Sequence, residues 1–260
     1  MIIDTNVYLS QWPTRRLPYD ETPRLVAKLK ESRVKSAWTG SFDGLLHKDI
    51  SAVNARLVEE CEKYGDGILV PFGSINPTLP GWQEDLRCCA EDPKMPGIRL
   101  HPNYHGYKLN DQVVRDLFDL CQEHALIVQL AMKMEDERTQ HKLLRVEPAD
   151  TKPLAALVNN RPKLKVVVLN GLRTLRDDAL SELAEAGQVW FEISMQEGVG
   201  GMERLLQHLP PERILFGSYF PFFYFESAIL KLRESELGGV QREAIQYENA
   251  KRLLANQKSP

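Results

Sequence analysis

The chain has 260 residues, of which 43% are hydrophobic and 27% are charged. This composition excludes a disordered, collagen-like or disulfide-scaffold protein. The 33 basic and 36 acidic residues leave a net charge of −3. The chain therefore has no excess of positive charge that would attract nucleic acid or an anionic membrane surface, so we expect neither as a partner.

The cellular setting is predicted from the N-terminus, the apolar runs and the cysteines. The opening MIIDTNVYL lacks the basic region of a signal peptide and is typical of a strand. No apolar run approaches the roughly 18 residues that a membrane helix needs. Cys88 and Cys89 are adjacent and would form a strained disulfide, so we expect reduced thiols. These features together predict a soluble cytoplasmic protein.

Eight β-rich runs recur at intervals of roughly 30 residues, which is the length of one βα unit. Several of them are continuous apolar stretches, as is typical of parallel strands buried on both faces. In chain order the predicted strands are residues 2–9, 34–41, 67–75, 97–101, 126–132, 165–170, 189–194 and 214–218.

Amphipathic segments lie between these runs. Thr22 is the predicted N-cap of the first helix, with Pro23 at its first position. Eight alternations predict an α/β protein that forms one (β/α)8 TIM-barrel domain over residues 1–260, with a doubly wound open sheet as the alternative. No GxGxxG motif follows the first strand, which disfavours dinucleotide binding. The other predicted helices are residues 54–64, 111–124, 151–160, 179–186 and 243–255.

Two long polar connections are predicted at the carboxyl end of the barrel, where barrel enzymes place their active sites. Residues 133–150 follow the fifth strand and are unusually long for such a connection, which is often a sign of function. The segment SQWPTRRLPYD follows the first strand. We expect the first of these loops to cover the barrel mouth, either as a substrate clamp or as a solvated loop with local salt bridges.

Four motifs resemble the amidohydrolase superfamily, in particular its amidohydrolase-related branch, which includes aminocarboxymuconate-semialdehyde decarboxylase-like enzymes. They are MIIDTNVYL, GIRLHPNYHGY, ILFGSYFPF and IQYENAKRLL. The resemblance implies a metal-dependent TIM-barrel hydrolase or decarboxylase that acts on small carboxylated or cyclic substrates. In that family the metal is held by a His-x-His pair on strand one, histidines on strands five and six, and an Asp on strand eight.

The sequence departs from this pattern at every ligand position. Asn6 and Tyr8 replace the His-x-His pair, Ala131 and Asn170 replace the two later histidines, and Tyr219 replaces the aspartate. Zinc needs three or four imidazole, thiolate or carboxylate ligands, which these residues do not supply. We therefore predict no metal and no cofactor at this site.

Strand alternation predicts a polar barrel interior. Asp4 and Arg99 are expected to form an interior ion pair. His101 is a candidate general acid or base, or else a histidine bonded to Asn103 or to the loop at His105. Lys133 is a carboxylate anchor, a Schiff-base lysine or a solvated side chain. The candidate catalytic residues are His101, Tyr219 and Asn170, and the candidate substrate-binding residues are Asn6, Tyr8, Arg99, Lys133, Glu135 and Arg138.

Three functions remain open. The first is a metal-independent hydrolase or lyase of a small carboxylate, lactone or sugar acid, whose ligand is a small anion. The second is a non-catalytic ligand-binding barrel, with Tyr8 and Tyr219 packed together over a closed mouth. The third is a metal-dependent hydrolase with atypical ligands, although scattered acids and histidines indicate such a site only weakly. The aromatic segment PFFYFESAILKL after the last strand is either rim packing or the interface of a homo-oligomer.

Overall fold

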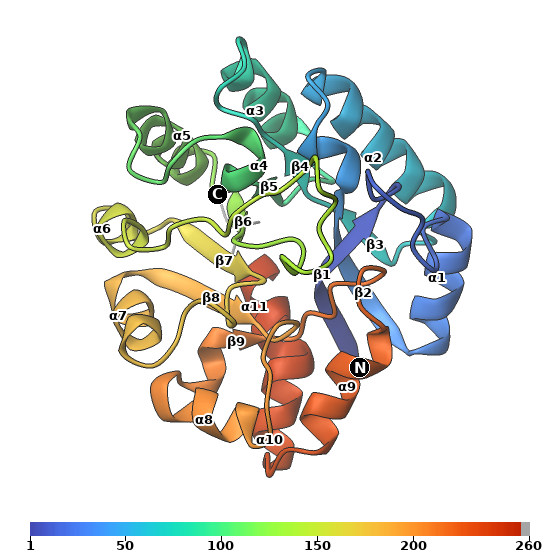
Figure 1. Cartoon of the computed structure of the whole chain (residues 1–260), viewed down its shortest axis with the longest axis vertical. Coiled ribbons are helices and arrows are strands. Elements are labelled where there is room, and N and C mark those ends of the chain that lie inside the picture. Colours follow the sequence, from blue (N-terminus) through green and yellow to red (C-terminus); the bar gives the residue numbers. More distant parts are fainter. Residues whose placement is uncertain (256–260) are drawn as a thin grey trace.

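The computed structural model describes residues 1–255. Parallel strands surround a central axis, and helices form an outer ring around them (Figure 1). Two sheets contribute, with the strand orders β1-β2-β3 and β4-β5-β6-β7-β8-β9. The strands are β1 (Ile2–Leu9), β2 (Val34–Ser41), β3 (Leu69–Pro71), β4 (Gly73–Ser74), β5 (Gly97–Leu100), β6 (Ile127–Ala131), β7 (Lys165–Leu169), β8 (Gln188–Glu192) and β9 (Ile214–Leu215).

Backbone hydrogen bonds close the two sheets into one eight-stranded barrel. Only Phe72 separates β3 from β4, so these two pieces form the third barrel strand, and Phe72 N donates to Thr39 O of β2 at 2.8 Å. At the other seam, Thr5 N of β1 donates to Phe216 O at 2.9 Å. The predicted TIM barrel is therefore confirmed, with the third predicted strand broken into two.

The helices cover the outside of the barrel (Figure 1). Glu21, not Thr22, is the N-cap of α1, and the Glu21 side chain makes no capping hydrogen bond within the described residues. Helices α3, α8 and α9 were not among the predicted segments. The helices are α1 (Thr22–Glu31), η1 (Phe42–Leu45), α2 (Ile50–Tyr64), α3 (Trp82–Glu91), α4 (Pro102–His105), α5 (Gln112–Glu123), α6 (Leu154–Asn159), α7 (Asp178–Ala186), α8 (Gly201–His208), η2 (Pro211–Arg213), α9 (Phe225–Arg233), α10 (Gly239–Glu243), the π-helix η3 (Ala244–Glu248) and α11 (Asn249–Ala255).

Apolar side chains fill both the space under the helices and the inside of the barrel. The inner cluster includes Trp38 and Phe72, whose rings stack with their centroids 5.1 Å apart. Ile127 and Val167 lie in the same cluster and have no exposed surface. The lower part of the barrel is therefore a packed core and not a pore, as is usual for this fold.

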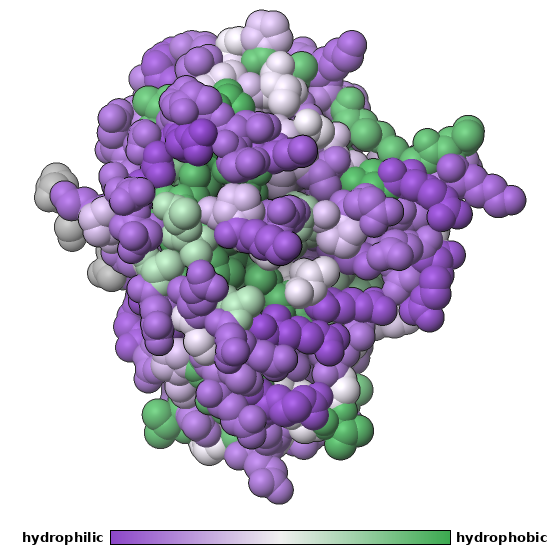
Figure 2. Space-filling model, turned by 60° about the vertical axis from the view of Figure 1, so that its left-hand side comes forward, coloured by the Kyte–Doolittle hydropathy of each residue, from purple (hydrophilic) through white to green (hydrophobic). Residues whose placement is uncertain are grey.

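The surface is mostly hydrophilic, with only small apolar patches on the face that Figure 2 shows. Within residues 1–255, no helix combines the length and the apolar character required to span a bilayer. All four cysteines are free, and Cys88 alone is exposed.

Candidate functional site

The carboxylate of Asp4 on β1 lies fully buried inside the barrel. It accepts hydrogen bonds from the backbone N–H groups of Ser218 at 3.0 Å and of Asn6 at 3.1 Å, and from the Ser218 hydroxyl. Complete burial raises the pKa of Asp4 to about 7 despite these donors. The expected ion pair with Arg99 is wrong, because the guanidinium makes its hydrogen bonds elsewhere.

The buried guanidinium of Arg99 ties four strands together. Nε donates to Gln129 Oε1 on β6 at 2.7 Å, Nη1 to Val7 O on β1 at 2.8 Å, and Nη2 to Trp38 O on β2 at 3.0 Å. A Cβ atom at Gly40 would lie only 2.7 Å from Nη1, so glycine is needed there to admit the guanidinium. Each Arg99 nitrogen thus already has a protein acceptor.

Above Arg99, Tyr8 shares a hydrogen bond with a histidine. The Tyr8 ring centroid lies 4.3 Å from the Arg99 guanidinium carbon, and Tyr8 Oη lies 3.0 Å from His101 Nε2. Burial raises the pKa of Tyr8 to about 12 and lowers that of His101 well below its usual value, so both groups are neutral at pH 7. Within residues 1–255, His101 Nδ1 has no hydrogen-bond partner, and the alternative of a side-chain bond from His101 to Asn103 or to the loop at His105 is not formed.

A network of amides and a carboxylate lies on the opposite side of the barrel. Asn6 Nδ2 donates to Asn170 Oδ1 at 2.8 Å and to Glu192 Oε1 at 3.2 Å. Glu192 also accepts from Asn170 N at 2.6 Å, and from the N–H and hydroxyl of Ser194 at 2.6 and 2.7 Å. Burial raises the pKa of Glu192, against the lowering effect of these donors. Asn6 Oδ1 and Asn170 Nδ2 are buried without a partner.

Aromatic rings close the mouth of the barrel above these groups. Tyr8 stacks on Phe42 with centroids 4.6 Å apart, and Tyr219 meets Tyr8 edge-on at 5.7 Å. Phe222 stacks on Tyr219 at 4.9 Å, and Trp12 meets Phe42 edge-on at 5.2 Å. Tyr8, Tyr219 and His101 have no exposed surface. The predicted packing of Tyr8 against Tyr219 is therefore confirmed.

The connection after β6 lies across the mouth and completes the closure (Figure 1). Tyr219 Oη donates to Met134 O at 2.7 Å. Glu135 is 2% exposed and forms an ion pair with Arg15 from the connection after β1. The long loop is thus held to its neighbour over the barrel.

Several other charged residues of this loop form ion pairs with each other or with Arg173, which lies outside the loop. Lys133 lies 3.3 Å from Glu137 and is largely buried, so it does not extend into solvent. Arg138 Nε donates to Asp136 Oδ1 at 2.9 Å, and its side chain is 82% exposed. Arg173 Nη1 donates to Asp136 Oδ2 at 2.8 Å. Arg138 thus belongs to a solvent-exposed salt bridge and is not turned into the barrel, whereas Lys133 and Glu135 are buried.

The family's metal does not fit the residues that occupy its site. Tyr8 and Tyr219 are protonated phenols whose oxygens already bind His101 and Met134. Arg99 adds a positive charge directly beneath Tyr8, which would repel a cation. Across residues 1–255, no three His, Cys, Asp or Glu side chains are grouped so that they could hold a metal ion. The donor set therefore does not suit a divalent transition metal.

Sequence reasoning placed Asp4, Arg99 and Gln129 in the barrel interior, where they are buried, but missed Ser218, which holds Asp4. It also missed Phe42 and Met134, which close the mouth together with Phe222. The aromatic residues that follow strands β2 and β9 in the sequence could have indicated that the mouth is closed.

Comparison with known proteins identifies the fold and the family. The chain resembles solved structures of 2,6-dihydroxybenzoate decarboxylase from Rhizobium (14% identity, 98% of both chains covered, TM-score 0.70) and of 5-carboxyvanillate decarboxylase from Sphingomonas paucimobilis (12%, 98% of both, 0.77). A 5-carboxyvanillate decarboxylase from Novosphingobium aromaticivorans, solved with bound manganese and 4-hydroxy-3-methoxy-5-nitrobenzoic acid, is also similar (13%, 98% of this chain and 96% of that one, 0.75). At these identities the likeness establishes the fold alone.

No curated protein gives a significant match to the sequence. The sequence model of a family described as Amidohydrolase matches residues 10–255, which is most of the chain. The predicted family is thereby confirmed. The chain belongs to the amidohydrolase family.

Proposed function

We propose that this protein is a non-catalytic member of its family that acts by binding, without the metal chemistry of its relatives. The closed mouth carries the proposal. Tyr8, Phe42 and Tyr219 occupy the top of the barrel in mutual contact, and the polar groups beneath them have no exposed surface. Native-like packing at this place leaves no volume for a metal and a substrate together.

The protonation states of the buried groups support the same proposal. A general acid or base is most effective when its pKa lies near the working pH and it can reach the substrate. Burial moves the pKa values of His101 and Tyr8 away from neutrality in opposite directions. Asp4 has a pKa near 7 but is held by Ser218 at the bottom of the polar layer. None of these groups is poised for proton transfer to a bound molecule.

The experiment combines metal analysis with a decarboxylation assay. Protein purified without chelator is analysed for transition metals, and carbon dioxide release is measured with 2,6-dihydroxybenzoate and 5-carboxyvanillate, the acids that similar proteins are named for, with and without added manganese. We expect substoichiometric metal and no release above the blank. Stoichiometric manganese, or release that disappears in His101→Ala, would contradict the proposal.

One observation favours a second candidate, a metal-independent hydrolase or lyase of a small anionic carboxylate. Asn6 Oδ1, Asn170 Nδ2 and His101 Nδ1 are buried polar atoms without partners. Such atoms are rare in folded proteins and require an explanation, and a polar ligand admitted when the loops open would supply one. In this candidate His101 moves the proton, Arg99 or Lys133 holds the carboxylate, and the amides and phenols of Asn6, Tyr8, Asn170 and Tyr219 orient the substrate.

The two candidates differ in what Asn170 and His101 do for a ligand. A small aromatic carboxylate is titrated into the protein, and binding is followed by the shift of the side-chain amide resonances. The second candidate requires saturable binding that His101→Ala or Asn170→Ala abolishes, whereas Tyr224→Phe on the exposed rim leaves it unchanged. Absence of binding in the wild-type protein removes this candidate.

A further inference from the structure

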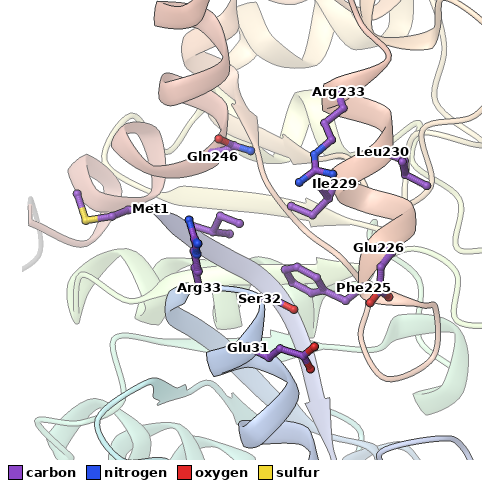
Figure 3. Close-up of a pocket in the computed structure, with 11 residues that line it drawn as sticks. Met1, Glu31, Ser32, Arg33, Phe225, Glu226, Ile229, Leu230, Arg233 and Gln246 are labelled. Carbon is purple, nitrogen blue, oxygen red and sulfur yellow. The ribbon is translucent and has the colours of Figure 1, made fainter.

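A second hollow lies at the end of the barrel opposite the mouth. It has a volume of about 670 Å³ and runs between the end of α1, the helix α9 and the first residues of β1 (Figure 3). This volume lies in the range of small-molecule pockets. Five side chains give it an apolar lining: Met1, Ile2, Phe225, Ile229 and Leu230.

The acidic side chains around this hollow have an ion-pair partner, whereas two of its arginines have none within the described residues. Lys28 Nζ lies 2.5 Å from Glu226 and 3.7 Å from Glu31, so a single lysine serves both acids. The Arg33 and Arg233 guanidinium groups have no hydrogen-bond or ion-pair partner within the part of the chain that the structure describes. Two free guanidinium groups thus lie beside an apolar surface.

The polar groups face the same space. Figure 3 shows the ends of Arg33 and Arg233 turned into the hollow from opposite sides, with the Gln246 amide between them. Gln246 belongs to the π-helix η3, and π-helical turns are rare and are frequent at functional sites. The Ile245 carbonyl in the same turn accepts from Phe216 N at 2.9 Å, so the turn also supports the barrel seam.

The backbone at Arg33 is in the left-handed region, with φ of 59°. This position follows the end of α1, where glycine is the preferred residue because it has no Cβ. An arginine is therefore held in a conformation that glycine would adopt more easily. Replacing it by glycine removes the guanidinium while favouring the local backbone, which provides an unusually clean test.

We propose that this hollow binds an amphipathic carboxylate, with its anionic head between Arg33 and Arg233 and its aliphatic tail along Phe225 and Ile229. Arginine pairs with carboxylates through two parallel hydrogen bonds, and Gln246 supplies a further donor. The site lies at the opposite end of the barrel from Tyr8 and His101. This proposal therefore does not depend on whether the barrel mouth is catalytic. If the protein acts by binding, it names the class of ligand that is bound.

The experiment titrates octanoate, octylamine and acetate into the full-length protein by calorimetry. We expect saturable octanoate binding, with octylamine and acetate at least tenfold weaker. Arg33→Gly and Arg233→Gln should each weaken octanoate binding about tenfold, the size expected for a charged hydrogen bond at a partly exposed site. Arg176→Gln is the matched control, because Arg176 is an exposed, unpaired arginine on the loop after β7, at the other end of the barrel.

Thermal unfolding separates binding from folding. Arg33→Gly should unfold at or above the wild-type temperature, so a loss of its octanoate affinity cannot be ascribed to a damaged fold. Equal octanoate affinity in wild type and Arg33→Gly, equal affinity for octylamine, or linear uptake without saturation would each overturn the proposal. Acetate that binds as tightly as octanoate would also overturn it, because the apolar lining would then contribute nothing.

Discussion

Replacement of Tyr8 by phenylalanine removes one oxygen atom from the centre of the closed mouth. The ring keeps its stacking on Phe42 at 4.6 Å and its place over the Arg99 guanidinium. The lost contacts are the 3.0 Å hydrogen bond between Tyr8 Oη and His101 Nε2 and the weaker one that Tyr8 Oη donates to Met134 Sδ at 3.7 Å. Because His101 Nδ1 is already without a partner, the imidazole would then have no side-chain hydrogen bond at all.

The magnitude follows from burial. A buried polar group that loses its partner destabilises the folded state by about 1–3 kcal/mol, and both partners here have no exposed surface. We therefore expect Tyr8→Phe to lower the free energy of unfolding by about 2 kcal/mol. For a chain of this size that corresponds to a fall of roughly 4–8 °C in Tm. Urea denaturation and calorimetry measure both quantities, and Tyr224→Phe on the exposed rim should change neither by a measurable amount.

An increase in the free energy of unfolding on Tyr8→Phe would refute the reasoning. Active-site residues are often kept at the expense of stability, so their replacement by apolar residues stabilises the fold. A Tyr8→Phe protein as stable as the wild type, or more stable, would identify the hydroxyl as functional. A double-mutant cycle with His101→Leu isolates the pair, and we expect a coupling of at least about 1 kcal/mol between the two positions.

Three further predictions concern other parts of the molecule. Burial raises the pKa of Asp4 in the folded state to about 7, above its unfolded value, so between these pH values the folded state keeps a proton that the unfolded state has released. Wild type should therefore lose stability relative to Asp4→Asn as the pH rises from about 4 to about 7. A difference in unfolding free energy that does not change with pH, measured by urea titration, would contradict this. Arg15→Gln removes the ion pair with Glu135 and should speed amide hydrogen exchange in residues 133–150, whereas Arg16→Gln, which removes the pair with Asp20, should not. Equal protection of residues 133–150 in both variants would show that the Arg15–Glu135 pair does not hold this loop in place. One thiol, Cys88, should react rapidly with a disulfide reagent and the other three only on unfolding, and a second fast thiol would show that the core is open.

The barrel could be predicted from sequence because its strands are β-rich runs at regular spacing, several of them continuously apolar. Val166 to Leu169 illustrate this, since they lie in a buried parallel strand, whereas the buried β1 run includes the polar residues Asp4, Thr5 and Asn6. Helix α3 was missed although its buried residues, Trp82, Leu86 and Cys89, recur at spacings of four and three, which is the period of an amphipathic helix. The sequence therefore contained the signal for this helix.

The interior of the site could be predicted only in part. Strand alternation correctly placed Asp4 and Arg99 inside, but it gives the face of a residue and not its height along the barrel axis. In the structure Arg99 lies level with Gln129 and Ser74, and Asp4 reaches Ser218, which follows the neighbouring strand β9. The height of a residue along the barrel axis depends on how neighbouring strands are aligned, and the residue pattern within one strand does not show that alignment.

The closure of the mouth depends on residues from connections rather than strands. Phe42 lies in the turn after β2, and Phe222 lies in the loop after β9. Their positions follow from how the loops pack over the barrel. The alternative of a closed mouth, with Tyr8 and Tyr219 packed together, could therefore be stated from sequence, but the part that Phe42 plays in the closure could not.

The central claim is that organic side chains fill the place where relatives bind a cation. Crystals grown in manganese and measured at the manganese absorption edge test it most directly. The account predicts no anomalous peak among Asn6, Tyr8, Asn170 and Tyr219, with the Tyr8 hydroxyl still bonded to His101. An anomalous peak inside that ring, with the Tyr8 ring displaced from Phe42 to admit the ion, would contradict it.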